Sequence, residues 1–145
     1  MKKFKKSFIV IMMSFVMALG FADIGAEGAS AKTWKVTGSL YTTWYVSGYF
    51  SNYVIVSKTF TQTQPGYSTI IAGVEANSKA KGYFTAYLQK KSGSKWITIK
   101  TVKVKRNGYT SLTYHSATKA TYRYMFVNTG SKTRVNYTFS VKQAI

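Results

Sequence analysis

The sequence predicts an all-β fold, a small antiparallel β-sandwich in which two sheets of about seven to nine strands in total pack face to face. Three observations lead to this prediction: apolar and polar residues alternate along several segments after residue 32, turn signals separate these segments, and no window has a helical period. Alternation places one face of each strand on a core and the other in solvent. A small closed β-barrel is the alternative, since it would show the same pattern.

The first 31 residues have the composition of a signal peptide rather than of the domain. Four lysines occur among the first six residues, an apolar run extends from Phe8 to Phe21, and Ala29-Ser30-Ala31 supplies the small residues that a signal peptidase reads. The apolar run, roughly 14 residues, is shorter than the ~20 that a membrane-spanning helix needs. We therefore expect cleavage after Ala31, secretion, and a single domain over residues 32–145 with no transmembrane segment in the mature chain.

The chain that remains after cleavage is strongly basic and almost free of carboxylates. Four of the 21 lysines and arginines precede residue 32, and Glu75 is the one acidic residue of three that follows it. Seventeen cations and one carboxylate give a net charge of +16. The 12 tyrosines and three tryptophans can build a core in a domain of this size. The lack of cysteine in an exported chain favours a bacterial source.

A β-hairpin is predicted in the middle of the chain. Residues 83–88 alternate, Ser92-Gly93-Ser94 has turn chemistry, and residues 96–105 return. In the return strand the apolar residues change from odd to even positions. This change predicts a β-bulge near Lys100-Thr101.

A second hairpin is predicted at the end of the chain. Thr121–Val127 and Arg134–Lys142 both alternate, and Asn128–Thr133 between them is rich in turn residues, with Gly130 able to adopt a positive φ. Further strands are expected at Thr33–Val46, Tyr49–Thr61, Ser68–Ala76 and Tyr109–Tyr114, with turns at Gln64-Pro65-Gly66, Asn77–Gly82 and Arg106-Asn107-Gly108.

Most catalytic chemistry is missing after residue 31, where the chain has no Asp, no Cys, one Glu and one His. Two carboxylates for a glycosidase and the ligands of a zinc or calcium site are therefore lacking. We expect a protein that is not an enzyme and has no metal or other cofactor. A hydrolase would need Glu75 and His115 to share a pocket. The simpler expectation is that Glu75 forms an ion pair with a lysine and that His115 lies on the surface.

Cationic side chains interleaved with aromatic and hydroxyl residues are abundant. We expect them to form a surface that attracts polyanions in a salt-dependent way. The leading hypothesis is a secreted binding protein that adsorbs to anionic cell-envelope polymers or membranes, with an antibacterial effect. The candidate binding residues are Lys90, Lys91, Lys95, Lys103, Lys105, Arg106, Arg123 and Arg134.

Two other classes of function stay open. Threonine-rich strands and many tyrosines suit an extracellular matrix or surface-assembly protein that self-associates through strand edges. A carbohydrate-binding module, or an inhibitor of a hydrolase, is the other alternative, because exposed aromatic rings stack on sugars. The candidate rings for carbohydrate are Tyr41, Trp44, Tyr45, Tyr49 and Tyr53.

One short segment, Tyr49-Phe50-Ser51-Asn52-Tyr53 followed by Ser57-Lys58-Thr59, resembles a stretch of the lactococcin 972 type of bacteriocin. The resemblance covers about ten residues, and Val54 and Phe60 stand where that family usually has histidines. It implies a small cationic secreted β-sandwich that acts at the cell envelope.

Overall fold

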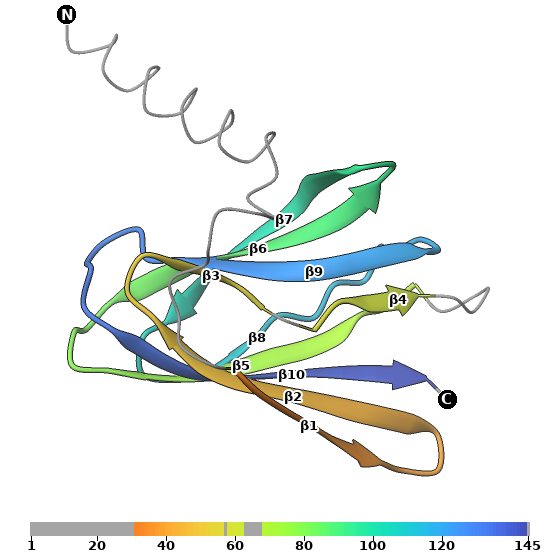
Figure 1. The fold of residues 1–145 in the computed structure, drawn as a ribbon, viewed down its shortest axis with the longest axis horizontal. Helices are drawn as coiled ribbons and strands as arrows, with labels where there is room; N and C mark the ends of the chain where they lie inside the picture. The colour runs from red at the N-terminus through yellow and green to blue at the C-terminus, as the bar shows by residue number, and fades with distance from the viewer. Residues whose placement is uncertain (1–30, 57, 63–67, 145) are drawn as a thin grey trace, which may run out of the picture.

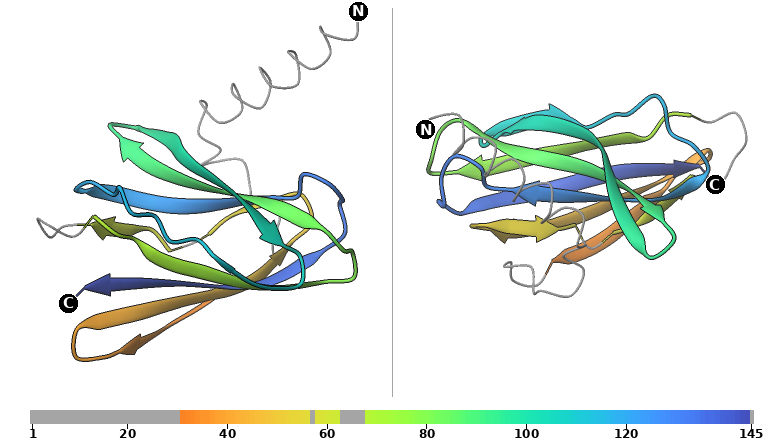
Figure 2. Two further views of the ribbon diagram at one scale, coloured as in Figure 1. Left: turned by 180° about the vertical axis from the view of Figure 1, so that it is seen from behind. Right: turned by 90° about the horizontal axis from the view of Figure 1, so that it is seen from above.

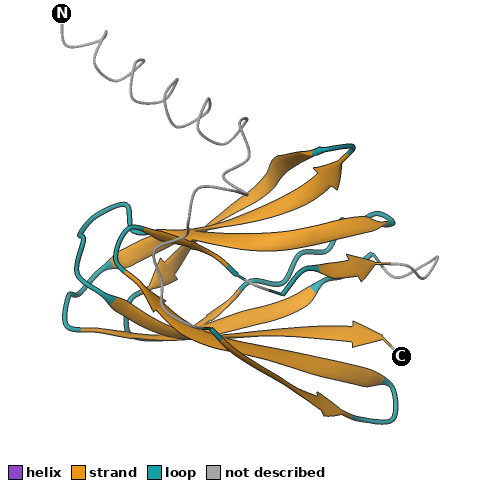
Figure 3. Ribbon diagram, viewed as in Figure 1, coloured by secondary structure: helices purple, strands orange, loops and turns teal. Residues whose placement is uncertain are grey.

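Strands and loops make up the described part of the chain, residues 31–56, 58–62 and 68–144 of a computed structural model (Figures 1 and 3). Residues 1–30 of the expected signal peptide and the expected turn at Gln64-Pro65-Gly66 lie outside it. The described ranges contain no helix that is long and apolar enough to cross a membrane. The strands are β1 (Lys32–Thr37), β2 (Tyr41–Phe50), β3 (Tyr53–Ile55), β4 (Phe60–Gln62), β5 (Ile71–Ser78), β6 (Tyr83–Ser92), β7 (Lys95–Lys105), β8 (Gly108–Ser111), β9 (Ala120–Val127) and β10 (Val135–Ala144).

These strands form two antiparallel sheets that face each other (Figures 1 and 2). Sheet A has the order β1-β2-β10-β5-β8. Sheet B has the order β3-β9-β6-β7, with β4 also paired to β9. The predicted β-sandwich is therefore confirmed.

The core lies between the sheets and is rich in aromatic rings. Phe50 and Phe139 reach it from sheet A, and Phe84 and Phe126 reach it from sheet B; all four are fully buried. The Phe126 ring centroid lies 5.4 Å from that of Phe84 and 5.3 Å from that of Tyr137. Burial of one such ring contributes about 1.5–3 kcal/mol, so these rings join the two sheets.

The hairpin predicted in the middle of the chain is β6–β7, which Gly93 closes with a φ of 60°. Leu88 pairs with Lys100 and Gln89 with Thr98, so Ile99 is an extra residue in β7. The predicted bulge is thus present, one position before Lys100. Because the extra residue shifts the alternation by one position, apolar residues both before and after the bulge face the same core.

The second predicted hairpin is wrong. β9 pairs with β6, β3 and β4 in sheet B, whereas β10 pairs with β2 and β5 in sheet A. Residues 128–134 therefore cross from one sheet to the other (Figure 2). Both strands cover the same core from opposite sides, which satisfies their apolar faces as well as a hairpin would. The glycines with positive φ among the described residues are Gly82, Gly93 and Gly108, and Gly130 is not one of them.

Two of the expected strands are divided in the structure, which brings the number to ten among the described residues. The segment predicted at 33–46 turns between β1 and β2, where the Gly38 N–H donates to the Tyr41 carbonyl at 2.8 Å. The segment predicted at 49–61 supplies the end of β2 and all of β3 and β4. The strand expected at 109–114 is β8, followed by an isolated bridge between Ile70 and Tyr114.

Candidate functional site

The outer face of sheet A carries a row of polar side chains from all five strands. Residues directly opposite each other in an antiparallel pair point to the same face. The pairing places Lys32, Ser47, Thr138, Glu75 and Tyr109 next to one another, from β1, β2, β10, β5 and β8 in turn. The sheet thus collects hydroxyl, carboxylate, ammonium and aromatic groups that are distant in the sequence.

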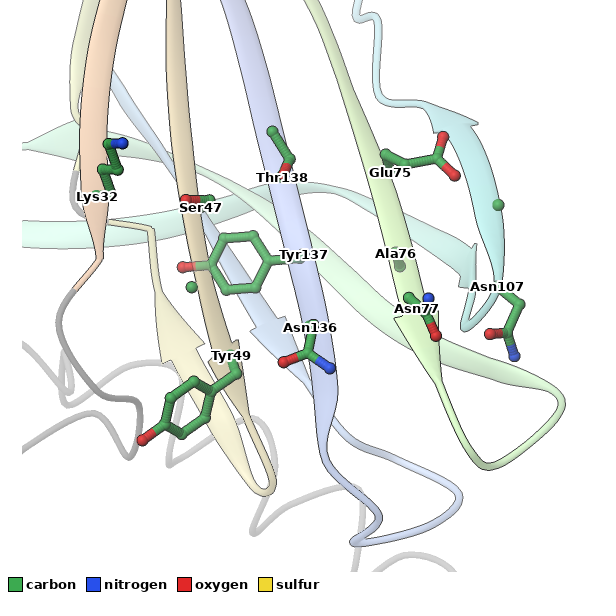
Figure 4. A pocket seen from close by; sticks show the side chains of 12 residues that line it. Lys32, Ser47, Tyr49, Glu75, Ala76, Asn77, Asn107, Asn136, Tyr137 and Thr138 are labelled. Atoms are coloured by element: carbon green, nitrogen blue, oxygen red, sulfur yellow. The ribbon is translucent and has the colours of Figure 1, made fainter.

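This row borders a depression of about 590 Å³ that is open to solvent. Next to this row, toward the loops, Asn136 on β10 pairs with Tyr49 on β2 and with Asn77 on β5. Two amide side chains therefore lie beside the row. Figure 4 shows Lys32, Ser47, Thr138 and Glu75 on neighbouring strands, with the asparagine side chains nearer the loops. The depression is lined by Lys32, Ser47, Gly48, Tyr49, Glu75, Ala76, Asn77, Asn107, Gly108, Asn136, Tyr137 and Thr138.

Aromatic rings flank the outer face of sheet A on both sides. On β1 and β2, Trp34 and Tyr45 stack with centroids 5.3 Å apart and planes 9° apart. On β8, Tyr109 is 59% exposed and its ring covers Gly73, where a Cβ would lie 2.6 Å from the ring carbons. Three strand spacings, about 14 Å, separate β2 from β8. Small residues, Ser140 and Gly73, pair between them.

Glu75 has no counterion in the part of the chain that the structure describes. Its side chain is exposed on β5, and its register neighbours are Thr138 on β10 and Tyr109 on β8, both uncharged. No lysine or arginine of residues 31–56, 58–62 and 68–144 comes within ion-pair distance of it. The expected lysine ion pair is therefore wrong, because the cations lie on other strands and at the loops.

His115 lies apart from Glu75. Its Nδ1 is 3.4 Å from the Thr69 Oγ1, and it follows Tyr114, which bridges to Ile70. Six residues separate Thr69 from Glu75, or about 20 Å along extended chain. The structure does not bring together the two groups that a hydrolase would use. The described ranges also hold no group of three residues arranged to bind a metal ion.

The eight candidate cations do not form one surface. Lys90, Lys91 and Lys95 lie at the β6–β7 turn, whereas Lys103 and Lys105 lie toward the opposite end of β7. Ten residue steps from Lys95 to Lys105 correspond to about 33 Å. Lys90 is half-buried, with its Nζ 2.7 Å from the Thr118 Oγ1, whereas the other four lysines are exposed. Arg134 is exposed at the same end as Lys105.

Arg106 is buried and holds a loop in place. It is 1% exposed, its Nη2 donates to the Ser131 carbonyl at 3.1 Å, and its backbone N–H donates to the Gly82 carbonyl at 2.9 Å. A second guanidinium nitrogen reaches the Thr133 carbonyl at 3.5 Å. Desolvation lowers the pKa of Arg106. Its hydrogen bonds thus join the loops before β6 and before β10, and the guanidinium is not available to a polymer.

Arg123 is also buried, although it lies on the outer face of sheet B. It is 4% exposed, its Nε donates to the Gln89 Oε1 at 2.8 Å, and its guanidinium carbon lies 4.2 Å from the Trp96 ring centroid. Gln89 in turn donates to the Thr98 Oγ1 at 3.4 Å. Desolvation lowers the pKa of Arg123. These partners make Arg123 part of the sheet rather than a free cation.

Five exposed cations gather at the end of the sandwich that lies at the left in Figure 1, where three loops meet. Arg106 joins two of these loops, the Asn107 Nδ2 donates to the Ala80 carbonyl at 3.2 Å, and the Ser78 Oγ donates to the Arg134 carbonyl at 2.9 Å. We call Lys79, Lys81, Lys105, Lys132 and Arg134 the loop-end cations. Two of them, Lys105 and Arg134, belong to the set expected from the sequence.

The aromatic residues expected to meet carbohydrate are divided between the two sheets. Tyr41, Tyr45 and Tyr49 lie on the outer face of sheet A, and the Arg134 guanidinium carbon is 3.5 Å from the Tyr49 ring centroid. Trp44 points inward against the core, with the Lys58 Nζ 3.7 Å from its ring centroid. Desolvation and, secondarily, Lys35 lower the pKa of Lys58.

Tyr53 belongs to β3 in sheet B and is not part of the depression. Sequence reasoning did not identify the hydroxyl and amide residues of the depression. They are Ser47, Asn77, Asn107, Asn136 and Thr138. A signal exists for Asn136 and Thr138, which occupy polar positions of the alternating segment Arg134–Lys142, whereas Asn77 and Asn107 fall in expected turns and Ser47 between two expected strands.

Comparison with protein-family models and with curated protein sequences gives no match. Among solved structures, a chain described as "CBM4 structure and function" is similar with a TM-score of 0.37 and 8% sequence identity. The similarity covers 81% of this chain and 90% of that one. At this identity and TM-score it says nothing about a ligand of the present chain.

Proposed function

We propose that the protein is secreted, is not an enzyme, and binds an anionic glycan-containing polymer of the cell envelope through the outer face of sheet A and the loop-end cations. One observation supports this most: Arg134, one of the loop-end cations, lies against the ring of Tyr49, which lines the depression. Asn107, which lines the depression, comes two residues after Lys105, and Asn136, which also lines it, comes two residues after Arg134. A polymer that lies in the depression would therefore reach the cations.

The outer face of sheet A supplies the groups that sugars need. The exposed Tyr109 ring offers a flat apolar face to a sugar ring, and the amides of Asn136 and Asn77 can donate to and accept from hydroxyl groups. The depression is open rather than enclosed, which suits a chain that continues beyond the site at both ends. The face is about 14 Å wide between β2 and β8, enough for a short stretch of sugars.

The loop-end cations supply attraction to acidic groups. Exposed ammonium and guanidinium groups raise the local concentration of a polyanion, and this effect falls as salt screens it. Arg134 also stacks on Tyr49, which places a cation directly beside the depression. Teichoic acids and acidic polysaccharides carry phosphate or carboxylate groups of the required sign.

Secretion would complete the site. Cleavage after Ala31 would make Lys32 the first residue, so that its α-ammonium group would lie at the edge of the depression that Lys32 lines. Amino-terminal sequencing of the protein from culture medium tests this part. A mature chain that begins well after Lys32 would lack β1 residues and contradict it.

Two double variants with the same loss of charge test the binding proposal. Lys105→Gln with Lys132→Gln removes two loop-end cations, and Lys91→Gln with Lys95→Gln removes two cations at the β6–β7 turn. Affinity for purified wall teichoic acid is measured by calorimetry over a salt series. We expect the loop-end variant to lose affinity and salt dependence, and the other variant to stay close to the wild type. Equal effects in both variants would mean attraction by net charge alone, without a site.

The segment that resembles lactococcin 972 bacteriocins favours growth inhibition as a second readout. It forms the end of β2 and the start of β3, and Tyr49 in it lines the depression. We expect purified protein to inhibit bacteria whose walls bind it. If such bacteria grow fully at a saturating concentration of the protein, the antibacterial part of the proposal is wrong, while the binding part is unaffected.

Self-association through a sheet edge is the structural alternative. β1 is an edge strand, and all six of its residues are exposed. Lys32 and Lys35 on it oppose edge-to-edge pairing, because like charges would meet. We therefore expect a monomer, and light scattering over a concentration series would show oligomers if assembly were the function.

A further inference from the structure

The charge of Glu75 indicates a positively charged group on the ligand. Glu75 is the one carboxylate after residue 31, it lines the depression, and no cation of the described chain neutralises it although seventeen lysines and arginines follow residue 31. We propose that the repeating unit of the bound polymer carries a protonated amine as well as acidic groups, and that Glu75 and the Tyr109 ring bind the amine. This inference rests on the function proposed above and specifies its ligand.

The geometry around Glu75 suits an ammonium group. Glu75 and Tyr109 are register partners on β5 and β8, and Figure 4 shows the Glu75 carboxylate directed toward β8. The Tyr109 ring covers Gly73, the next outward position on β5 from Glu75, so the ring and the carboxylate occupy successive outward positions of one face, and much of the ring is exposed. A carboxylate next to an exposed aromatic ring offers both an ion pair and a cation–π contact.

An amine explains the unpaired carboxylate better than a sugar hydroxyl does. A hydrogen bond between a carboxylate and an ammonium group is charge-assisted on both sides and is stronger than one to a neutral hydroxyl. A neutral ligand would leave the negative charge of Glu75 uncompensated at the interface. To bind the hydroxyl groups of a neutral sugar, an asparagine such as Asn136 or Asn77 would serve in place of Glu75.

The amine must belong to a polymer that is also acidic. A net charge of +16 after residue 31 repels a purely cationic ligand and attracts an anionic one. Lys32 lies on the same face as Glu75, three strand spacings or about 14 Å away. Arg134 lies beside Tyr49 at the edge of the depression. Acidic groups of the ligand would meet these cations while its amine meets Glu75.

Teichoic acid with and without D-alanyl esters provides a matched pair of probes. Mild alkali removes the alanyl groups, which takes away the amines and leaves a polymer with more net negative charge. Calorimetry at pH 6 keeps the esters intact and the amines protonated. We expect the wild type to bind the alanylated polymer about fivefold more tightly, as one exposed charged contact would give. Attraction by the seventeen cations alone predicts the opposite order.

The variant Glu75→Gln keeps the shape of the side chain and removes its charge. We expect it to prefer the alanine-free polymer. Ser92→Lys is the matched control, because it raises the net charge by the same amount at the β6–β7 turn, far from the depression; it should keep the wild-type preference. An acidic wall polysaccharide with free amino sugars, compared with the same polymer after N-acetylation, separates amino sugars from aminoacyl esters as the source of the amine.

The outcomes separate this inference from the proposed function. A preference for the amine-bearing member of either pair that Glu75→Gln abolishes supports the inference. Tighter binding of the alanine-free teichoic acid by the wild type, together with no preference for the amine-bearing polysaccharide, overturns it while the proposed function stands. Binding of no polymer at low salt would overturn the proposed function itself.

Discussion

The adjacent residues Lys105 and Arg106 carry the same charge but are predicted to have opposite roles. Both are cations that the sequence assigns to polyanion binding, yet Lys105 is exposed and Arg106 is 1% exposed. Replacing each with alanine removes one positive charge from neighbouring positions. We expect Arg106→Ala to lower the stability and Lys105→Ala to lower the binding.

The stability cost follows from the contacts of Arg106. A hydrogen bond from a charged group contributes about 1.5–3 kcal/mol, and the 3.1 Å bond to the Ser131 carbonyl is of this kind. The 3.5 Å contact to the Thr133 carbonyl adds little, but the lost side chain also leaves the half-buried Ser131 carbonyl without this donor. We expect a loss of about 3 kcal/mol in the free energy of unfolding, which for a domain of this size is roughly 12 °C in Tm. Lys105→Ala should stay within about 0.5 kcal/mol of the wild type.

Urea denaturation measures the free energy of unfolding without the screening that guanidinium would add. Retention on immobilised teichoic acid, at a temperature where both variants are folded, measures binding. The reasoning fails if Arg106→Ala unfolds at the wild-type urea concentration and loses as much retention as Lys105→Ala. Arg106 would then be a contact residue.

Three further outcomes are expected. Burial raises the pKa of Tyr137 to about 12, so the unfolded state, with its tyrosine near 10, loses its proton first; stability should fall by about 1.3 kcal/mol through this residue between pH 9 and pH 11, and Tyr137→Phe should reduce the measured fall in unfolding free energy over this pH range by that amount. Gly73→Ala should displace the Tyr109 ring and weaken teichoic acid binding in calorimetry with little change in Tm, since the ring is exposed and can rotate away; unchanged affinity would remove Tyr109 from the site. Phe126→Ala should cost about 3–5 kcal/mol in urea denaturation, because its ring contacts aromatic rings of both sheets; a smaller loss would mean that the core closes around the gap.

The candidate site was only partly predictable from the sequence. The polar face of Arg134–Lys142 was recognised, and it supplies Asn136 and Thr138 to the depression. The partners of Thr138, which are Ser47 and Glu75, come from segments about 90 and 60 residues earlier, and only the pairing of β10 with both β2 and β5 brings them together. A one-residue change in that register would point them into the core instead.

Nothing in the sequence indicated that the guanidinium groups of Arg106 and Arg123 are buried. Arg123 occupies an outward position of an alternating strand and Arg106 belongs to an expected turn, and a charged residue at either place is ordinarily solvated. Arg106 is buried because the loop over residues 128–134 crosses above it and its carbonyls accept the guanidinium hydrogen bonds. Arg123 is buried because Trp96 on β7 and Gln89 on β6 cover it. Both causes are contacts between distant segments.

The sequence by itself determined the fold class, the β6–β7 hairpin and its bulge, and the charge of the surface, because period-two alternation and turn residues act over a few neighbouring positions. Only the tertiary structure decided that β9 and β10 belong to different sheets. A strand that buries one apolar face is equally satisfied by a hairpin partner or by an opposing sheet, so alternation alone cannot choose between them. That choice places β10 between β2 and β5, and with it the outer face on which the binding site is proposed.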